Sequence, residues 1–325
     1  MKDASSPRLA SEETKEQVMV QAAKLYYELG RNQAEIADQL GLTRWQISRL
    51  LKEARDVGIV RIEIAPRSAR LPAVESALQD RFQLREAIVV QVRVNEPSIV
   101  RDDVAQAAAS YLRHLRPSPS LLGVSWGRTM SAVARWLPVD WADATDVVLL
   151  NGATSRYASG DRPNNVAERI ASAAHGQATI LPVPAIVGQR ETREAIERDP
   201  VISDILALAR KAEVAMFSLG ALTHGSVLVE SGFLSRADVD ALGAQGAVGD
   251  ILGRFVGPTG EPVDASTDAR TIGIHLRDLK SIETTIAVAG GQDKVGVIQA
   301  ALAAGYVDVL VTDATTAHTV LGRTA

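Results

Sequence analysis

The sequence predicts a two-domain α/β protein, with a small helical domain at the N-terminus and a larger domain built on a mostly parallel β-sheet. Its 325 residues are long for one domain and comfortable for two. After about residue 85, short apolar runs alternate with helix-like stretches, which is the pattern of a parallel sheet covered on both faces. Hydrophobic residues make up 46% of the chain and aromatic residues only 4%, a mix that suits aliphatic layers.

The order of these patterns along the chain sets the expected boundaries. Two prolines, Pro66 and Pro72, mark the junction between the two domains. The predicted segments are a polar, disordered tail over 1–14, a helical domain over 15–65, a linker helix over 66–84 and the larger domain over 85–325.

The N-terminal domain is predicted to hold three helices. Apolar residues recur at helical spacing over about Glu16–Leu29 and again over Gln33–Leu40. A third helix is expected from Thr43, as its N-cap, to about Val57. The alternation over Ile59–Ile64 then predicts a short, half-exposed strand.

The second and third of these helices have the features of a helix-turn-helix. Ala37 provides the small residue where the two helices cross, and Gly41 can adopt the left-handed conformation that the turn needs. The apolar residues with the spacing to lock the helices together are Ile36, Leu40, Leu42, Ile47 and Leu50.

The outer side of the third helix is the predicted DNA-reading surface. Because Ile47, Leu50, Leu51 and Ala54 share its core side, Trp45, Arg49 and Lys52 point the opposite way. We expect Arg49 to read guanine, Trp45 to contact a thymine methyl or a sugar, and Arg44 and Lys52 to meet phosphates. The strand ending in Arg61-Ile62 would add a small wing. The complete predicted set is Gln33, Thr43, Arg44, Trp45, Gln46, Ser48, Arg49 and Lys52.

Bulk charge does not by itself indicate a nucleic-acid binder. The net charge is −4, and residues 1–67 carry 11 Lys+Arg against 10 Asp+Glu. Binding to DNA must therefore depend on local placement of cations. The alternative is a three-helix bundle with a solvated charged face.

Other features exclude several kinds of protein. The chain has no cysteine, which excludes disulfides and thiolate metal sites. It shows no membrane-length apolar run and no apolar signal-peptide centre near its start, so we expect a cytoplasmic protein. The histidines are scattered without a metal-binding pair, and neither a metal nor a cofactor is expected.

The larger domain is predicted to alternate strands with helices. The expected strands are Ala87–Val94, Leu121–Ser125, Val147–Asn151, Thr179–Val183, Val214–Leu219, Thr284–Ala289 and Val307–Thr312. The expected helices are Val100–Leu115, Arg128–Trp136, Val166–Ala174, Ser203–Lys211, Ser235–Leu242, Lys294–Ala304 and Ala314–Leu321.

A glycine-containing loop between a predicted strand and helix resembles a phosphate cradle. The run Gly123-Val-Ser125-Trp126-Gly127-Arg128-Thr129 offers two hydroxyls and the donor fork of an arginine. Gly127 allows close approach of the backbone, and the free N–H groups of the following helix point at the same place. Ligands of α/β sheets bind at this carboxyl edge, although many strand-to-helix turns contain glycine without binding anything.

Further polar residues could converge on that loop. Asn151-Gly152 ends the next strand, and Asn165 opens a helix. Asp250 could accept hydrogen bonds from sugar hydroxyls, and Lys294 could pair with a phosphate. The alternatives are an ordinary turn at Asn151-Gly152, a capping or solvated Asp250 and a surface Lys294. His224 is more simply a loop histidine than a ligand contact.

Motifs in order over about 16–322 resemble the SorC family of bacterial sugar-metabolism regulators. In the first domain they are LYYELG at 25–30, QAEIA at 33–37, LGLTR at 40–44 and ISRLLKEAR at 47–55. In the second they include GVSWGRT at 123–129, GAVGDI at 246–251, AGG at 289–291 and the threonine and aspartate at 312–313.

The resemblance implies a winged helix-turn-helix joined to a Rossmann-like effector domain of the sugar-phosphate isomerase and deaminase type. It also implies a tetramer on operator DNA, a phosphorylated sugar or polyol as effector, and effector-pocket positions at Asn151, Asp250 and Lys294. The family commonly has proline and a small polar residue where this chain has Trp45 and Gln46. The operator sequence therefore does not transfer.

We therefore expect a ligand-responsive transcriptional regulator rather than an enzyme. One alternative is a regulator of an unphosphorylated polyol or signalling sugar, and another is a constitutive architectural DNA-binding protein. A sugar-phosphate isomerase-like enzyme is a further alternative, but no carboxylate–histidine constellation surrounds Asp250.

Overall fold

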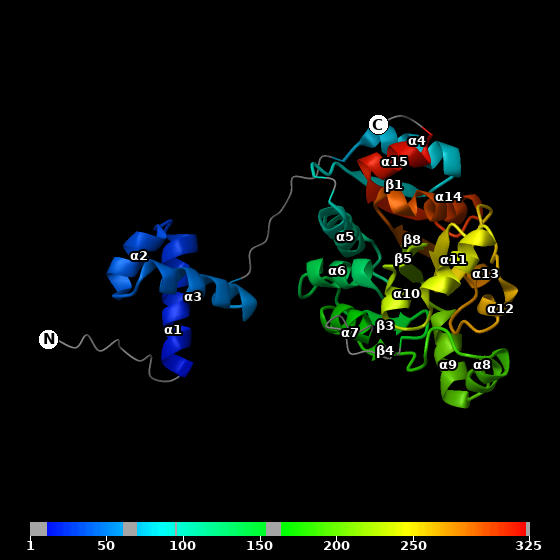
Figure 1. Ribbon diagram of the computed structural model, residues 1–325, viewed down its shortest axis with the longest axis horizontal. Helices are drawn as coiled ribbons and strands as arrows, with labels where there is room; N and C mark the ends of the chain where they lie inside the picture. Colours follow the sequence, from blue (N-terminus) through cyan, green and yellow to red (C-terminus); the bar gives the residue numbers. More distant parts are fainter. Residues whose placement is uncertain (1–11, 61–69, 95, 154–163, 323–325) are drawn as a thin grey trace. The chain divides into compact units, whose positions relative to one another are not determined.

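A computed structural model describes residues 12–60, 70–94, 96–153 and 164–322 (Figure 1). The chain divides into two compact units, Met1–Arg67 and Ser68–Ala325. The described part of the predicted disordered tail is already helical, because the first helix begins at Glu12. None of the helices in the described ranges combines the length and apolar character that crossing a membrane requires.

The first unit is a three-helix domain, as predicted. It consists of α1 (Glu12–Ala23) with a π-helical turn (Lys24–Glu28), α2 (Gln33–Leu40) and α3 (Arg44–Asp56). One small core holds it together, and the buried members include Ile36 and Ile47.

The end of the first helix differs from the prediction. The π-helical turn adds a residue per turn and rotates the helix face. As a result Leu29, expected on the apolar stripe, is 66% exposed.

The turn between α2 and α3 has the geometry that the helix-turn-helix prediction requires. Gly41 adopts the left-handed conformation with φ +67°, and Ala37 is buried. Thr43 caps α3, since its hydroxyl accepts the backbone N–H of Gln46. Residues 61–64 of the predicted wing strand lie outside the described residues, and residues 59–60 form bends.

The second unit is a doubly wound α/β domain. Within the described residues its sheet has nine strands, and the main path runs β1-β9-β8-β5-β2-β3-β4 with every neighbouring pair parallel. Strands β6 and β7 form an antiparallel extension on β5. The strands are β1 (Glu86–Val90), β2 (Leu121–Val124), β3 (Asp146–Leu149), β4 (Ala178–Thr179), β5 (Val214–Ala221), β6 (Gly249–Ile251), β7 (Arg254–Val256), β8 (Thr284–Val288) and β9 (Val309–Asp313).

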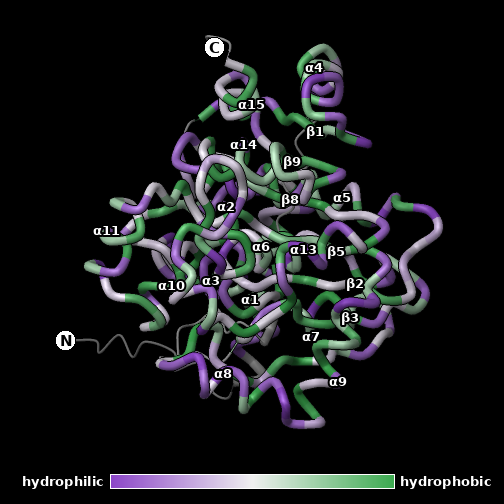
Figure 2. Tube along the Cα trace, turned by 90° about the vertical axis from the view of Figure 1, so that its right-hand side faces the viewer, coloured by the Kyte–Doolittle hydropathy of each residue, from purple (hydrophilic) through white to green (hydrophobic). Residues whose placement is uncertain are grey.

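Helices cover both faces of this sheet. Helices α5, α6 and α7 cover the face that includes Val124 and Met216, whereas α4, α14 and α15 cover the face that includes Phe217 and Leu310. Figure 2 shows hydrophobic stretches along the strands and hydrophilic residues on outer turns. The helices are α4 (Pro72–Phe82), α5 (Pro97–His114), α6 (Arg128–Trp136), α7 (Asn164–Ser172), α8 (Arg190–Glu197), α9 (Pro200–Ala209), α10 (Val227–Glu230), α11 (Arg236–Ala244), α12 (Ala265–Asp268), α13 (Leu276–Leu279), the 3₁₀ turn η2 (Gln292–Lys294), α14 (Val295–Ala303) and α15 (Ala314–Val320).

The predicted linker helix packs as part of this second unit. Leu78 of α4 is fully buried in the core that contains β1. Glu75 of α4 is also buried, and its Oε1 accepts the backbone N–H of Val89 at 2.9 Å and the Nε–H of Arg70 at 2.8 Å. Together Glu75 and Arg70 occupy polar groups along the outer edge of β1, which protects that edge from pairing with another strand.

Several elements were not predicted. Helix α8 and the β6–β7 hairpin have no counterpart among the expected elements, and β4 is shorter than expected. Both strands of the hairpin have only three residues, too few for an alternating pattern to show.

Candidate functional site

The outer face of α3 presents the cations and the aromatic ring that periodicity predicted. Ile47, Leu50, Leu51 and Ala54 are buried against the other helices. Trp45 is 68% exposed, and Arg49 and Lys52 are exposed on the same side. The guanidinium carbon of Arg49 lies 5.6 Å from the centroid of the Trp45 ring. This cation–π contact holds the arginine beside the ring on the exposed side of α3.

The remaining residues of the predicted DNA-reading set have different surroundings. Arg44 and Ser48 are exposed, while Gln33 is half-buried at the start of α2. The side chain of Gln46 accepts the backbone N–H of Thr43 at 2.8 Å, which completes a capping box. Thr43 and Gln46 therefore stabilise the beginning of α3, next to the exposed strip.

A second candidate site lies in the α/β unit, where the strand order reverses. From the middle of the sheet toward one edge the strands follow in the order β2, β3 and β4. Toward the other edge they follow in the order β5, β8 and β9. The switch point lies between β2 and β5, and Val124 at the carboxyl end of β2 pairs with Met216 near the start of β5. The carboxyl edge at such a switch point is the general ligand position of open α/β sheets.

Two serines and a lysine join across this switch point. The backbone N–H of Ser218 donates to Oγ of Ser125 at 3.2 Å. Nζ of Lys294 donates to Oγ of Ser218 at 3.4 Å. Ser125 follows β2, Ser218 lies on β5 and Lys294 precedes α14, so three elements far apart in sequence meet at one point.

Asp250 enters the site from β6, opposite Gly220 of β5. Its Oδ2 accepts the N–H of Gly253 at 3.0 Å. A Cβ at Gly220 would lie 1.8 Å from Oδ1, so only glycine leaves room for this carboxylate. Burial raises the pKa of Asp250 to about 6, opposed by the Gly253 hydrogen bond and by the positive charge of Lys294.

Lys294 is the main cation of the site. Burial lowers its pKa to about 8, while the carboxylates of Asp293 and Asp250 act in the opposite direction. Arg101 and Arg128 lower this pKa further, because like charges nearby disfavour the ammonium form. Arginines of two other elements thus bring positive charge toward this lysine, while Asp293 and Asp250 bring negative charge.

The residues that follow the carboxyl end of β3 form a further part of this candidate site. Asn151 is buried, and no hydrogen-bond partner reaches its Oδ1 within the described part of the chain. Nε1 of Trp126 donates to the carbonyl oxygen of Gly152 at 2.8 Å. Trp126 is itself buried, so it ties the end of β2 to the end of β3 and has no N–H left for a ligand.

The other predicted residues occupy several positions around the crevice. Gly127 has φ +125° and immediately precedes α6, whereas Thr129 is buried in the first turn. Gly123 lies within β2, where a Cβ would meet the side chain of Leu150 at 2.5 Å, so this glycine serves packing. Arg128 donates to the carbonyl of Gly225 and forms an ion pair with Glu230. Asn165 lies in the first turn of α7, and its side chain is outside the described residues.

The structure adds residues that the sequence did not single out as site residues. Ser218 contacts both Ser125 and Lys294, and Arg101 contributes charge from α5. The buried Asp313 accepts the N–H of Gly291 at 3.0 Å and so fixes the loop that leads to Lys294. His224, by contrast, forms a hydrogen bond of 2.7 Å with Asp240. No cluster of acidic or histidine ligands suited to a metal occurs in the described ranges.

Comparison with known proteins gives consistent matches. The sugar-binding domain family called Sugar-bind matches residues 67–322. The deoxyribonucleoside regulator of Bacillus subtilis is 31% identical over 304 residues, covering 94% of this chain and 97% of that protein. The transcriptional regulator LsrR of Klebsiella pneumoniae is 33% identical over 310 residues, covering 94% and 93%.

A solved structure is similar over most of the chain. The full-length sorbitol operon regulator SorC of Klebsiella pneumoniae superposes with a TM-score of 0.71 at 28% identity. The match covers 94% of this chain and 98% of that one.

Proposed function

Because the chain belongs to the SorC/DeoR-type family of transcriptional regulators with a sugar-binding domain, we propose that a phosphorylated sugar or polyol controls its binding to operator DNA. The chain is thus a DNA-binding regulator and not an enzyme. The effector occupies the carboxyl edge of the parallel sheet, and the exposed strip of α3 reads the operator.

The concentration of positive charge around Lys294 carries the proposal of a phosphorylated effector. A partly buried ammonium, with Arg101 and Arg128 near enough to shift its pKa, favours a compact anion. The N-terminal end of α6 at Gly127 offers free N–H groups to the same anion. Arg128 can exchange its exposed partner Glu230 for a phosphate at little cost, because exposed ion pairs contribute little.

The sugar hydroxyls find acceptors on the opposite side of the crevice. Asp250 is held by Gly253 with one oxygen, and the buried Oδ1 of Asn151 has no donor among the residues that the structure describes. A hydroxyl donor from a sugar would satisfy that oxygen, which is costly to leave unpaired.

On the DNA side, we propose that Arg49 reads guanine while Trp45 orients it. Lys52 and Arg44 meet phosphates at either end of the strip. Gln33, Ser48 and the capping residues Thr43 and Gln46 complete the DNA-facing set.

We also propose a homo-oligomer, with a tetramer as the size that the family resemblance implies. Paired operator half-sites need paired reading helices. The protein would act in the cytoplasm, where its operator is accessible. Light scattering of the full chain with and without a palindromic operator measures the assembly.

A thermal shift panel tests the effector. We would compare monophosphates of a pentose, a deoxypentose, a hexose and a hexitol with their unphosphorylated parents and with inorganic phosphate. A ligand that binds the folded state raises the melting temperature. We expect a sugar or polyol phosphate to give the largest shift, and Lys294→Ala to remove it. A larger shift by an unphosphorylated parent would favour a polyol or free-sugar sensor instead.

A further inference from the structure

A buried arginine lies in the hairpin that carries Asp250. None of its hydrogen bonds to described residues reaches the proposed phosphate cradle at 123–129. Arg254 is in β7, and only 1% of its surface is exposed. Burying a guanidinium is costly unless its hydrogen bonds are satisfied. Its partners therefore show what this side chain is placed to hold.

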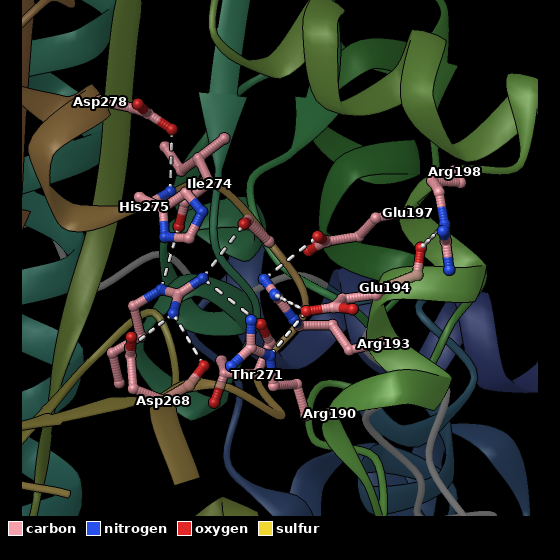
Figure 3. Close-up of polar contacts among 12 residues, drawn as sticks. Arg190, Arg193, Glu194, Glu197, Arg198, Asp268, Thr271, Ile274, His275 and Asp278 are labelled. Atoms are coloured by element: carbon pink, nitrogen blue, oxygen red, sulfur yellow. Dashed lines mark hydrogen bonds and ion pairs between the residues drawn. The ribbon is translucent and has the colours of Figure 1, made fainter. Parts of the chain in front are cut away.

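The guanidinium of Arg254 donates hydrogen bonds to several carbonyl oxygens of one short segment, residues 268–274. Nε donates to the carbonyl oxygen of Ile274 at 3.2 Å, and Nη2 donates to those of Thr271 at 3.4 Å and Gly273 at 3.3 Å. Nη1 donates to the backbone and side-chain oxygens of Asp268 at 3.2 and 2.5 Å. Figure 3 shows Asp268, Thr271 and Ile274 grouped around this network, with α8 and its Arg193–Glu197 pair alongside.

The segment that Arg254 holds packs directly against the backbone of residues 150–152. Gly273 forms an isolated antiparallel bridge with Asn151. The N–H of Gly152 donates to the carbonyl oxygen of Ile272 at 3.0 Å, and the N–H of Ile274 donates to that of Leu150 at 3.0 Å. A Cβ at Gly273 would lie 2.9 Å from Cα of Asn151, so the two backbones are in close contact.

At its other end, Arg254 belongs to the hairpin that presents Asp250. Ile251 pairs with Arg254, and the two residues between them, Leu252 and Gly253, both have positive φ as in a tight two-residue turn. The N–H of Gly253 donates to the Asp250 carboxylate. The same hairpin therefore carries the acceptor on one strand and the arginine on the other.

We propose that Arg254 is a positioning residue of the effector site, which fixes the distance between Asp250 and Asn151 by joining the β6–β7 hairpin to the 271–274 segment. This inference rests on the proposed function, because both ends of the link are proposed effector contacts. A planar fork that reaches several carbonyl oxygens at once is particular to arginine, and a lysine ammonium cannot replace it.

The test compares Arg254→Lys with a matched Arg270→Lys, at the residue that immediately precedes the 271–274 segment. Arg270 donates to the carbonyl of Val187 and is not bonded to the carbonyls of 271, 273 and 274. The probe is the panel monophosphate that raises the melting temperature of the wild-type chain most. Its Kd is measured by calorimetry well below the melting temperature of every variant, alongside affinity for operator DNA in its absence.

We expect Arg254→Lys to raise the Kd of that monophosphate by about tenfold or more, as loss of a supporting residue commonly does. Operator affinity without the monophosphate should not change, and Arg270→Lys should bind as the wild type does. A merely structural arginine would lower the melting temperature and leave Kd unchanged in the folded protein. A Kd within twofold of the wild type would overturn the proposal.

A second variant keeps the test decisive if Arg254→Lys does not fold. Asp268→Asn preserves an oxygen acceptor for Nη1 but removes the charge that anchors the guanidinium. It should raise Kd by several-fold, and an unchanged Kd would count against the link. If no panel compound stabilises the wild-type chain, the proposed effector class is wrong and this inference falls with it. A wild-type response with unaffected variants overturns the positioning role alone.

Discussion

The two candidate sites of this chain are built in opposite ways. The DNA-reading strip lies on one helix, and its members Trp45 and Arg49 extend into solvent. The effector site draws on the ends of strands from across the second unit and withdraws a lysine and an aspartate from water. The first site costs the fold little, whereas the second site places charges where they are costly.

This difference indicates that the second site, and not the first, lowers the stability of the fold in favour of binding. A surface cation keeps its hydration, so α3 would fold equally well without Arg49. Lys294 loses hydration, and among the described residues it gains a long hydrogen bond to Ser218 and the attraction of the Asp293 and Asp250 carboxylates. A residue kept under such conditions is expected to contribute to function rather than to folding.

The largest expected effect is that of Lys294→Met. Removal of the partly buried ammonium should weaken binding of the best panel monophosphate by about a hundredfold. The same change should stabilise the ligand-free protein by about 1 kcal/mol, because it removes an incompletely compensated charge. Calorimetry and urea unfolding measure the two effects.

Lys280→Met is the matched control for that experiment. Lys280 is exposed and lies over the ring of Tyr306, 5.2 Å from its centroid. It should leave monophosphate binding unchanged. If Lys294→Met destabilised the ligand-free chain and still bound the monophosphate normally, Lys294 would be a structural residue and the contrast between the two sites would fail.

The next largest effect belongs to Arg49→Ala. Loss of a bidentate contact to guanine should cost about 1–3 kcal/mol of specific operator affinity, while affinity for unrelated DNA changes little. Fluorescence anisotropy at several salt concentrations separates the two affinities. Arg55→Ala, an exposed arginine in the last turn of the same helix, is the control. Equal losses on specific and unrelated DNA would assign Arg49 to phosphate contact instead.

The dependence of effector binding on pH should be smaller. The pKa of Lys294 is about 8, so raising the pH through 8 removes its positive charge and its attraction for a phosphate. Affinity for the monophosphate should fall by up to about tenfold per pH unit above that value, because one proton is lost. Lys294→Arg retains its charge, and its affinity, if folded, should stay level over this range. A flat wild-type profile would remove Lys294 from direct contact with the anion.

The smallest effect should come from Thr43→Ala. Loss of the N-cap should lower the unfolding free energy of the first unit by about 1 kcal/mol, without changing the effector affinity of the second. Thr43→Ser retains the hydroxyl and should behave as the wild type. Hydrogen exchange of the backbone amides of α1, α2 and α3 reports on this unit. A change in monophosphate affinity would show that the two units are coupled more tightly than this account assumes.

The sequence was sufficient to predict the exposed side of α3 because the information there is local. A helical period, Gly41 and Thr43 together specify which side of α3 faces outward. The alternating strands and helices of the second unit were predictable for the same reason. The strand order was not, because it depends on contacts between residues far apart in sequence.

Residues of the second site that depend on strand order escaped prediction. Ser218 lies in an ordinary apolar strand, and only the pairing of β5 with β2 brings it to Ser125. Arg254 lies in a stretch for which no element was predicted, and it is buried because the 268–274 segment folds over it. No period or motif marks such residues, since their partners come from other elements.

Operator binding measured with and without effector tests whether the ligand of the second unit controls DNA binding. The full chain and its Lys294→Met variant would be titrated with operator DNA, each alone and with a saturating amount of the best panel monophosphate. We expect the monophosphate to change wild-type operator affinity by about 1–3 kcal/mol. The variant should bind operator like the ligand-free wild type and not respond. Identical wild-type affinities with and without a monophosphate that demonstrably binds would contradict it.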